Sequence, residues 1–167
     1  MKRRLSGLCL LLGLVLAAPV AADEIDMANA AYQRGDYATA EKLLLPLAES
    51  GNAYAQYRIG LVYAEATGPM RSTEEAAKWF ESAAMQGQPY AQYKLGILYV
   101  NGDGVAKDYV QAYVWLSLSA RSPAGSASEA RRQLDMITPR LSSTQLSDAK
   151  QLVRTWRPMK FDSGAPR

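Results

Sequence analysis

The stretch AQYRIGLVY at residues 55–63 returns as AQYKLGILY at residues 91–99. The two copies lie 36 residues apart, and self-similarity at a period of roughly 20 to 50 residues is the sequence signature of repeat architectures. In such chains each unit buries only part of an apolar face and completes its core by stacking on the next unit. The repeat therefore predicts a solenoid, and other landmarks should fall in the same register.

Three residues suited to cap helices follow the same period. Asp36, Ser72 and Asp108 lie 36 residues apart, and each stands just before an alanine-rich apolar stretch. A side-chain oxygen at such a position accepts a hydrogen bond from the free amides of the first helical turn. Ser72 and Glu75 also have the spacing of a capping box. The sequence thus predicts three helices that begin at equivalent places.

Small and bulky residues recur on one face of these three helices. The equivalent positions are Ala40, Ala76 and Ala112, then Leu43, Trp79 and Trp115, then Ala48, Ala84 and Ala120. Residues three and four apart share a helix face, so we expect the alanines to flank a bulky core side chain. Gly51 and Gly87 should end the first two helices, and Pro123 the third.

Glycines inside the other helix of each unit are a further recurring feature. Gly60 and Gly96 lie in the repeated stretch, where glycine costs on the order of 1 kcal/mol relative to alanine. Their recurrence predicts that a neighbouring helix crosses close to the backbone. The NGDGV segment at residues 101–105 is predicted as a tight turn, because it lacks the lysine of a phosphate loop and the alternating ligands of a calcium loop.

Together these residues resemble the Sel-1-like repeat, a relative of the tetratricopeptide repeat. Residues 55–90 and 91–126 match its pattern as two units, and residues 23–54 resemble a shortened N-terminal helix pair. The resemblance implies an all-α, right-handed α/α solenoid of tetratricopeptide-like helix pairs. The positions that carry the pattern are Gly60, Tyr63, Ala76, Trp79, Ala84, Gly87, Gly96, Tyr99, Gly102, Gly104, Ala112, Trp115 and Ala120.

The C-terminal part departs from the repeat. Residues 127–157 are predicted to form two capping helices, over 128–137 and 143–156, whose basic residues give the end of the stack a polar outer face. Residues 158–167 contain glycine, proline and serine with little apolar content, and are predicted to be a flexible tail.

The N-terminus has the order of a secretory signal peptide. Lys2, Arg3 and Arg4 precede an apolar run at residues 5–16, and small residues lead to a predicted cleavage site near Ala22. An uncleaved anchor is the alternative, but the run is shorter than the roughly 20 residues of a spanning helix. We expect a periplasmic or secreted protein whose mature chain has no stable membrane span.

Composition limits the chemistry that the chain can perform. The sequence contains no histidine, and Cys9, its single cysteine, lies in the predicted leader. This excludes Ser-His-Asp and Cys-His catalysis and His-based or thiolate metal sites from the mature chain. No catalytic residue, metal ligand or cofactor is therefore predicted, and the chain is not expected to be an enzyme.

Charge is distributed unevenly along the chain. Of 19 Lys and Arg residues three lie in the leader, which leaves 16 against 16 Asp and Glu in residues 23–167. Residues 23–120 hold 7 basic and 12 acidic side chains, whereas residues 121–167 hold 9 and 4. An acidic body with a basic end could orient a partner, although an ordinary solvated surface also explains the pattern.

Tyrosines near the start of each repeated helix are the candidate binding residues. Tyr54, Tyr57, Tyr90 and Tyr93 recur at the repeat period, with Arg58 and Lys94 beside them. Aromatic rings supply contact area at low entropic cost, so this set would suit an extended peptide or a glycan. The alternative is that Tyr57 and Tyr93 are packing positions of the repeat.

By resemblance, the function is that of an exported, non-catalytic scaffold or adaptor that binds another protein, expected in the cell envelope. Nucleic acid is not an expected partner. Scaffolding of cell-wall polysaccharide or exopolysaccharide is the first alternative. Binding or hydrolysis of β-lactams is the second, since Ser147 and Lys150 have Ser-x-x-Lys spacing, but the paired cysteines of the relatives associated with that activity are absent. We interpret the motif as a coincidence.

Overall fold

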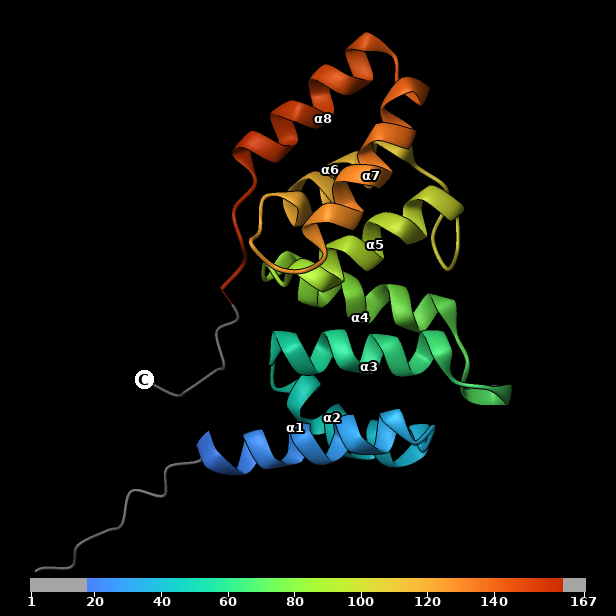
Figure 1. The fold of residues 1–167 in the computed structure, drawn as a ribbon, viewed down its shortest axis with the longest axis vertical. Coiled ribbons are helices and arrows are strands. Elements are labelled where there is room, and N and C mark those ends of the chain that lie inside the picture. The colour runs from blue at the N-terminus through green and yellow to red at the C-terminus, as the bar shows by residue number, and fades with distance from the viewer. Residues whose placement is uncertain (1–17, 161–167) are drawn as a thin grey trace, which may run out of the picture.

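The computed structural model describes residues 18–160, which stack as helices from α1 at one end to α8 at the other (Figure 1). The described residues contain no strand. The helices are α1 (Ala18–Gln33), α2 (Tyr37–Glu49), α3 (Ala53–Glu65), α4 (Thr73–Met85), α5 (Pro89–Asn101), α6 (Tyr109–Ala120), α7 (Ala127–Ile137) and α8 (Ser143–Thr155). Short 3-10 turns at Gly68–Met70 and Thr138–Arg140 precede α4 and α8.

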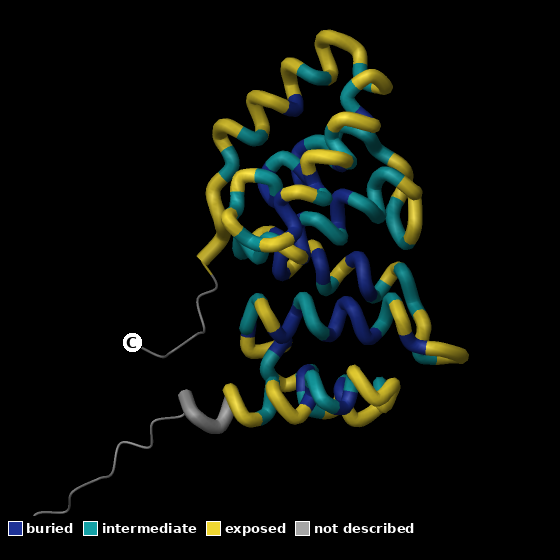
Figure 2. The backbone as a smooth tube through the Cα atoms, in the orientation of Figure 1, coloured by how far each residue is buried: buried dark blue, intermediate teal, exposed yellow. Residues whose placement is uncertain are grey.

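Consecutive helices from α1 to α7 pack against one another, and α8 returns to pack on α6. Buried residues accordingly form a column inside the stack, while the outer turns are exposed (Figure 2). This arrangement confirms the all-helical solenoid that the 36-residue period predicts. None of the helices in residues 18–160 is long and apolar enough to cross a membrane.

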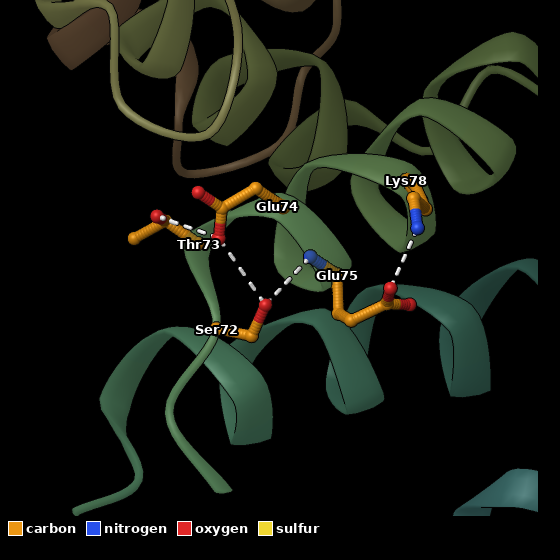
Figure 3. Close-up of polar contacts among 5 residues, drawn as sticks. All are labelled: Ser72, Thr73, Glu74, Glu75 and Lys78. Atoms are coloured by element: carbon orange, nitrogen blue, oxygen red, sulfur yellow. Dashed lines mark hydrogen bonds and ion pairs between the residues drawn. The ribbon is translucent and has the colours of Figure 1, made fainter. Parts of the chain in front are cut away.

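The three predicted helix caps are confirmed. Asp36 accepts a hydrogen bond from the Thr39 amide at 3.1 Å, and Asp108 accepts from the amides of the second and third residues of α6. Ser72 Oγ accepts from the Glu75 amide at 3.1 Å (Figure 3). Only half of a capping box forms, because the Glu75 carboxylate turns to Lys78 and the Ser72 amide donates to the Tyr63 carbonyl.

The most deeply buried bulky position lies one residue beyond the predicted one. Leu44, Phe80 and Leu116 are almost fully buried and share the 36-residue spacing. Of the predicted series, Trp115 is buried as expected, whereas Leu43 and Trp79 are only half-buried. The position four residues after Ala40, Ala76 or Ala112 lies between that alanine and the one eight residues on, whereas the position three residues after lies on its other side.

The interior glycines lie where helices cross closely, as predicted. A Cβ on Gly60 would lie 2.7 Å from the Phe80 ring, and one on Gly96 would lie 2.7 Å from Leu116 Cγ. Phe80 and Leu116 are equivalent residues, so each glycine receives the bulky side chain of the following helix. The packing is therefore the same in both repeats.

Two glutamines in the repeated stretch join consecutive helix pairs. Gln56 Nε2 donates to the Ala48 carbonyl at 3.0 Å, and Gln92 Nε2 donates to the equivalent Ala84 carbonyl at 3.2 Å. Both side chains are buried. Each carbonyl also accepts from the amide of the glycine that follows its helix, Gly51 or Gly87, so the glutamine adds a second bond and ties the next helix pair to this helix end.

The two chain ends differ in how far they are described. Most of the predicted signal peptide, residues 1–17, lies outside the described residues, and α1 begins at Ala18. The predicted flexible tail begins at Pro158, where the structure places residues 158–160 beside the turn between α4 and α5. The Met159 amide donates to the Met85 carbonyl at 2.8 Å. Residues 161–167 lie outside the described part.

Candidate functional site

A row of tyrosine rings connects the first turns of α3 and α5. The Tyr54 and Tyr57 ring centroids are 6.2 Å apart, and the rings of Tyr57 and Tyr90 stack at 5.8 Å with an interplanar angle of 28°. Tyr54 and Tyr90 are 41% and 39% exposed, so the two ends of the row face solvent. The stack between the repeats joins non-equivalent positions, because Tyr90 is the counterpart of Tyr54 and Tyr57 is the counterpart of Tyr93.

Beside this row lies a hollow of about 210 Å³, which we call the tyrosine hollow. One wall comes from α3 and α5, and the other comes from the loop before α7 and its first turn. The Gly125 amide donates to Tyr90 Oη at 3.3 Å, which ties the two walls together. The residues that line the hollow are Tyr57, Tyr90, Tyr93, Lys94, Gly125, Ser126 and Glu129.

The hollow combines neutral aromatic hydroxyls with one ammonium and one carboxylate. Burial raises the pKa of Tyr57, so its hydroxyl stays protonated at neutral pH. The hydrogen bond from the Ser128 hydroxyl lowers the pKa of Glu129, with a smaller contribution from Arg132, whose guanidinium lies 3.0 Å away. Glu129 is therefore ionised at neutral pH, and the hollow presents both signs of charge.

Ser126, the serine that lines the hollow, is not placed as a nucleophile. Ser126 Oγ lies 3.0 Å from Ser119 Oγ, and both residues are buried, so the hydroxyl is used within the fold. Within residues 18–160 no cluster of His, Cys, Asp and Glu side chains could hold a metal ion. Ser147 and Lys150 both lie on α8, where each is exposed to solvent.

Five of the six predicted partner-binding residues lie together. Tyr57, Tyr90, Tyr93 and Lys94 line the hollow, and Tyr54 extends the aromatic row. Arg58 lies apart from it. Its guanidinium stacks over the Tyr32 ring at 4.5 Å, and the Tyr32 hydroxyl donates to Glu65. Arg58 thus belongs to the contact between α1 and α3.

The residues that carry the repeat pattern divide by depth. Those that are buried are Gly60, Ala76, Ala84, Gly96, Ala112 and Trp115. Those of intermediate exposure are Tyr63, Trp79, Gly87, Tyr99, Gly104 and Ala120, and Gly102 is exposed. Gly102 and Gly104 have φ values of 81° and 68°, as the predicted turn requires.

Sequence reasoning did not find the wall that comes from α7. Gly125 and Ser126 stand at the very end of the second predicted unit and Glu129 lies beyond it. None of the three has a similar residue 36 positions earlier, so periodicity carries no signal for them. The small residues before α7 are the one local signal of a close contact there. Gly125 lies so near Tyr90 that a Cβ on it would be 3.2 Å from Tyr90 Oη.

Comparisons with known proteins place the chain among repeat proteins. The Sel1 repeat family matches residues 53–88 and 89–122, which correspond to the helix pairs α3–α4 and α5–α6. Comparison with curated proteins gives no match. Among solved structures, a protective antigen present in uropathogenic Escherichia coli strains and displaying an SLR fold is similar, with 26% identity and a TM-score of 0.72.

That match covers 81% of this chain but only 29% of the antigen, so the chain spans less than a third of that protein's length. A Sel1 repeat protein from Oxalobacter formigenes is 31% identical with a TM-score of 0.58, and the match covers 71% of this chain and 90% of that protein. Sel1 repeat proteins are generally protein-interaction scaffolds, and the fold is typically non-catalytic. The stacked helix pairs, the repeat match and these relatives together show that the chain belongs to the Sel1 repeat family.

Proposed function

We propose that this protein is a non-catalytic scaffold that binds another protein through the tyrosine row and the adjoining tyrosine hollow. The observation that carries the proposal is that the repeat gathers Tyr54, Tyr57 and Tyr90 into one partly exposed row. Large aromatic side chains supply contact area at low entropic cost, and they are enriched among residues that dominate interface energies.

The charged groups of the hollow would make such an interface selective for its partner and would orient that partner. Lys94 and Glu129 line the hollow together with the tyrosines, and charged groups at the rim of an interface favour partners of complementary charge. A peptide segment that places an apolar side chain on the Tyr57–Tyr90 stack would use both features. The scaffold would then hold its partner without any chemical step.

The test identifies a partner by crosslinking and then measures whether its affinity depends on the tyrosine row. Crosslinking of the protein in cells, followed by identification of the captured proteins, supplies a partner whose affinity is then measured with purified components. The variant Tyr54→Ala/Tyr90→Ala should weaken binding at least about tenfold, because exposed aromatic anchors typically contribute more than 1 kcal/mol each. Tyr90→Phe, which keeps the ring, should retain most of the affinity.

Met136→Ala is the matched control, since Met136 is an exposed apolar residue on α7 that is outside the tyrosine hollow. It should leave the affinity unchanged. If the double tyrosine variant binds the crosslinked partner as tightly as the control does, the row is not the binding surface and the proposal is wrong.

A polysaccharide scaffold is the second candidate, because a stacked aromatic platform beside Lys94 and Glu129 also suits sugar rings and hydroxyls. Pull-down with purified cell-wall glycans and exopolysaccharides separates the two. Retention of a glycan that the tyrosine variant abolishes would favour this candidate, and retention of none, beside crosslinked proteins, would remove it.

We place the working protein in the periplasm or outside the cell, after cleavage near Ala22. The support is the basic, apolar and small-residue order of residues 1–22. The buried alanines Ala28 and Ala31 of α1 lie beyond the cleavage site, so the cleaved chain retains them. N-terminal mass spectrometry of protein from fractionated cells should find Asp23 as the first residue, whereas a retained Met1 in the cytoplasmic fraction would contradict the assignment.

A further inference from the structure

A second depression lies at the C-terminal end of the stack, between α6, α7 and α8. Its volume is about 450 Å³, and its lining includes Ser117, Arg121, Leu134, Lys150, Val153 and Arg154. We call it the basic cleft. It shares no lining residue with the tyrosine hollow. In Figure 1, α8 runs obliquely over the end of the stack, which is how the cleft comes to be bounded by three helices.

Three cations surround the basic cleft, and no acidic residue lines it. Lys150 and Arg154 lie one turn apart on α8, so they share a helix face. Arg121 follows α6, and one of its guanidinium nitrogens donates to the Val153 carbonyl at 3.2 Å, which fixes the charge at the junction with α8. Within residues 18–160 the only ion pairs are Lys78–Glu75 and Arg132–Glu129, so none of these three cations forms an ion pair with a described carboxylate.

The floor of the basic cleft is apolar. Leu134 and Val153 are each half-buried, and both pack against core clusters on the side away from solvent. Ala149 is the one fully buried residue of α8. The helix therefore contacts the stack along a narrow stripe and leaves apolar surface beside that stripe open to solvent.

From this combination we propose that the basic cleft is a docking site for an acidic segment of a partner protein, one that carries a large apolar side chain between its carboxylates. The carboxylates would pair with Lys150, Arg154 and Arg121, and the apolar side chain would rest on Leu134 and Val153. A phosphate group alone would use the cations and leave the floor exposed, whereas an acidic, amphipathic peptide uses both. Residues 121–157, which form this end of the molecule, hold seven basic and three acidic side chains, and this excess steers such a segment toward the cleft.

The experiment uses the purified chain and three fluorescent peptides of equal length. The first alternates Glu with Leu and Phe, the second replaces Glu by Gln, and the third replaces Leu and Phe by Ser. The first peptide should bind at least about tenfold more tightly than either of the others, because each control removes one of the two complementary features. Phosphatidylglycerol vesicles and a thymidine oligonucleotide serve as anions without the peptide's apolar pattern.

Variants locate the binding. Lys150→Glu/Arg154→Glu should weaken binding of the first peptide at least about tenfold, since it reverses two charges at the cleft. Lys42→Glu/Arg71→Glu makes the same change in net charge at exposed residues far along the chain and should leave affinity unchanged. Ser117→Leu fills the cleft without altering its charge and should also weaken binding, with Ser117→Gln as the second filling variant if the first does not fold. Tyr54→Ala/Tyr90→Ala should have no effect.

The proposal is overturned if the first peptide does not bind, if the distant charge variant weakens binding as much as the cleft variant, or if folded Ser117 variants bind normally. It is also overturned if vesicles or the oligonucleotide bind as tightly as the first peptide, because the site would then be a general anion surface. Circular dichroism melting of each variant separates loss of binding from loss of fold.

Discussion

At the scale of single residues, the packing of the repeats depends on the absence of a Cβ atom at Gly60 and Gly96. Glycine in a helix interior costs on the order of 1 kcal/mol relative to alanine. That cost is offset because the missing Cβ lets the following helix approach, and full burial of a side chain such as Phe80 contributes about 1.5–3 kcal/mol. The local helix preference and the tertiary packing therefore oppose each other at these positions, and packing prevails.

Gly60→Ala should consequently destabilise the protein by about 1–3 kcal/mol, although alanine is the better helix former. The new Cβ would lie 2.7 Å from the buried Phe80 ring, which has little room to move. Urea unfolding followed by circular dichroism measures the change. Combining the substitution with Phe80→Leu should cost less than the sum of the two single variants, whereas strict additivity would show that Phe80 is not the residue that forbids the Cβ.

The glycines were predictable from the sequence, but their partners were not. A glycine that recurs inside a helix despite its cost indicates a close contact. The series Leu43, Trp79, Trp115 and the series Leu44, Phe80, Leu116 are both apolar and share one period, so periodicity does not say which series faces inward. The resolution comes from the direction of each helix face, which only the packed structure fixes.

At the scale of helices, the caps decide where each element begins. Ser72 follows an irregular segment that includes the 3-10 turn at Gly68–Met70, and its hydroxyl holds the first turn of α4 (Figure 3). Glu74 and Glu75 in that turn also place negative charge at the positive end of the helix dipole. The start of α4 is therefore fixed by side chains within four residues of each other.

Ser72→Ala should lower the free energy of unfolding by about 1 kcal/mol, because it removes the acceptor of the Glu75 amide. Hydrogen exchange should show faster exchange in the first turn of α4 and little change in α1 and α2. Ser72→Thr keeps the hydroxyl and should be close to the natural protein in stability. Equal losses in the alanine and threonine variants would mean that the hydroxyl is not what stabilises the turn.

The helix starts were also the elements best predicted, since a cap acts within one turn and its signal is local. The walls of the candidate site were predicted only in part. The α3 and α5 side of the tyrosine hollow follows from the 36-residue period, whereas Gly125 and Glu129 reach it through the packing of α7 on α6. That packing joins a repeat to a segment that lacks the repeat pattern, so the periodicity of the sequence does not predict it.

At the scale of the whole molecule, the fold is a linear stack, and each helix pair is stabilised mainly by its contacts with the neighbouring pairs. The period alone predicts this architecture, and the C-terminal helices that close the stack were expected from their basic, amphipathic sequence. The position of α8 was not expected. It packs on α6 rather than on α7, the helix before it, and it covers α6 through Ala149, Val153 and Trp156.

Truncation after Leu141, which removes α8, should therefore uncover apolar surface of α6. Loss of the Val153 and Trp156 contacts corresponds to about 2–3 kcal/mol, and Tm should fall by at least about 5 °C. Hydrogen exchange should accelerate in α6 and remain slow in α2 and α3, as a nearest-neighbour stack requires. Leu152→Ala, at a residue 47% exposed on α8, should leave Tm nearly unchanged, and a uniform acceleration along the chain would contradict the nearest-neighbour description.

The hydrogen bond from the Met159 amide to the Met85 carbonyl gives this local architecture one distant connection. Neighbouring helices can find each other over short loops, which favours rapid folding. The segment after α8 instead returns to the end of α4 and so closes a long loop. The entropy cost of closing that loop is offset by contacts only after the helices that supply the contact surface have formed. The order of assembly then runs from the repeats outward, with the chain end docking last. A force applied to the C-terminus would break this contact before it unfolds any helix.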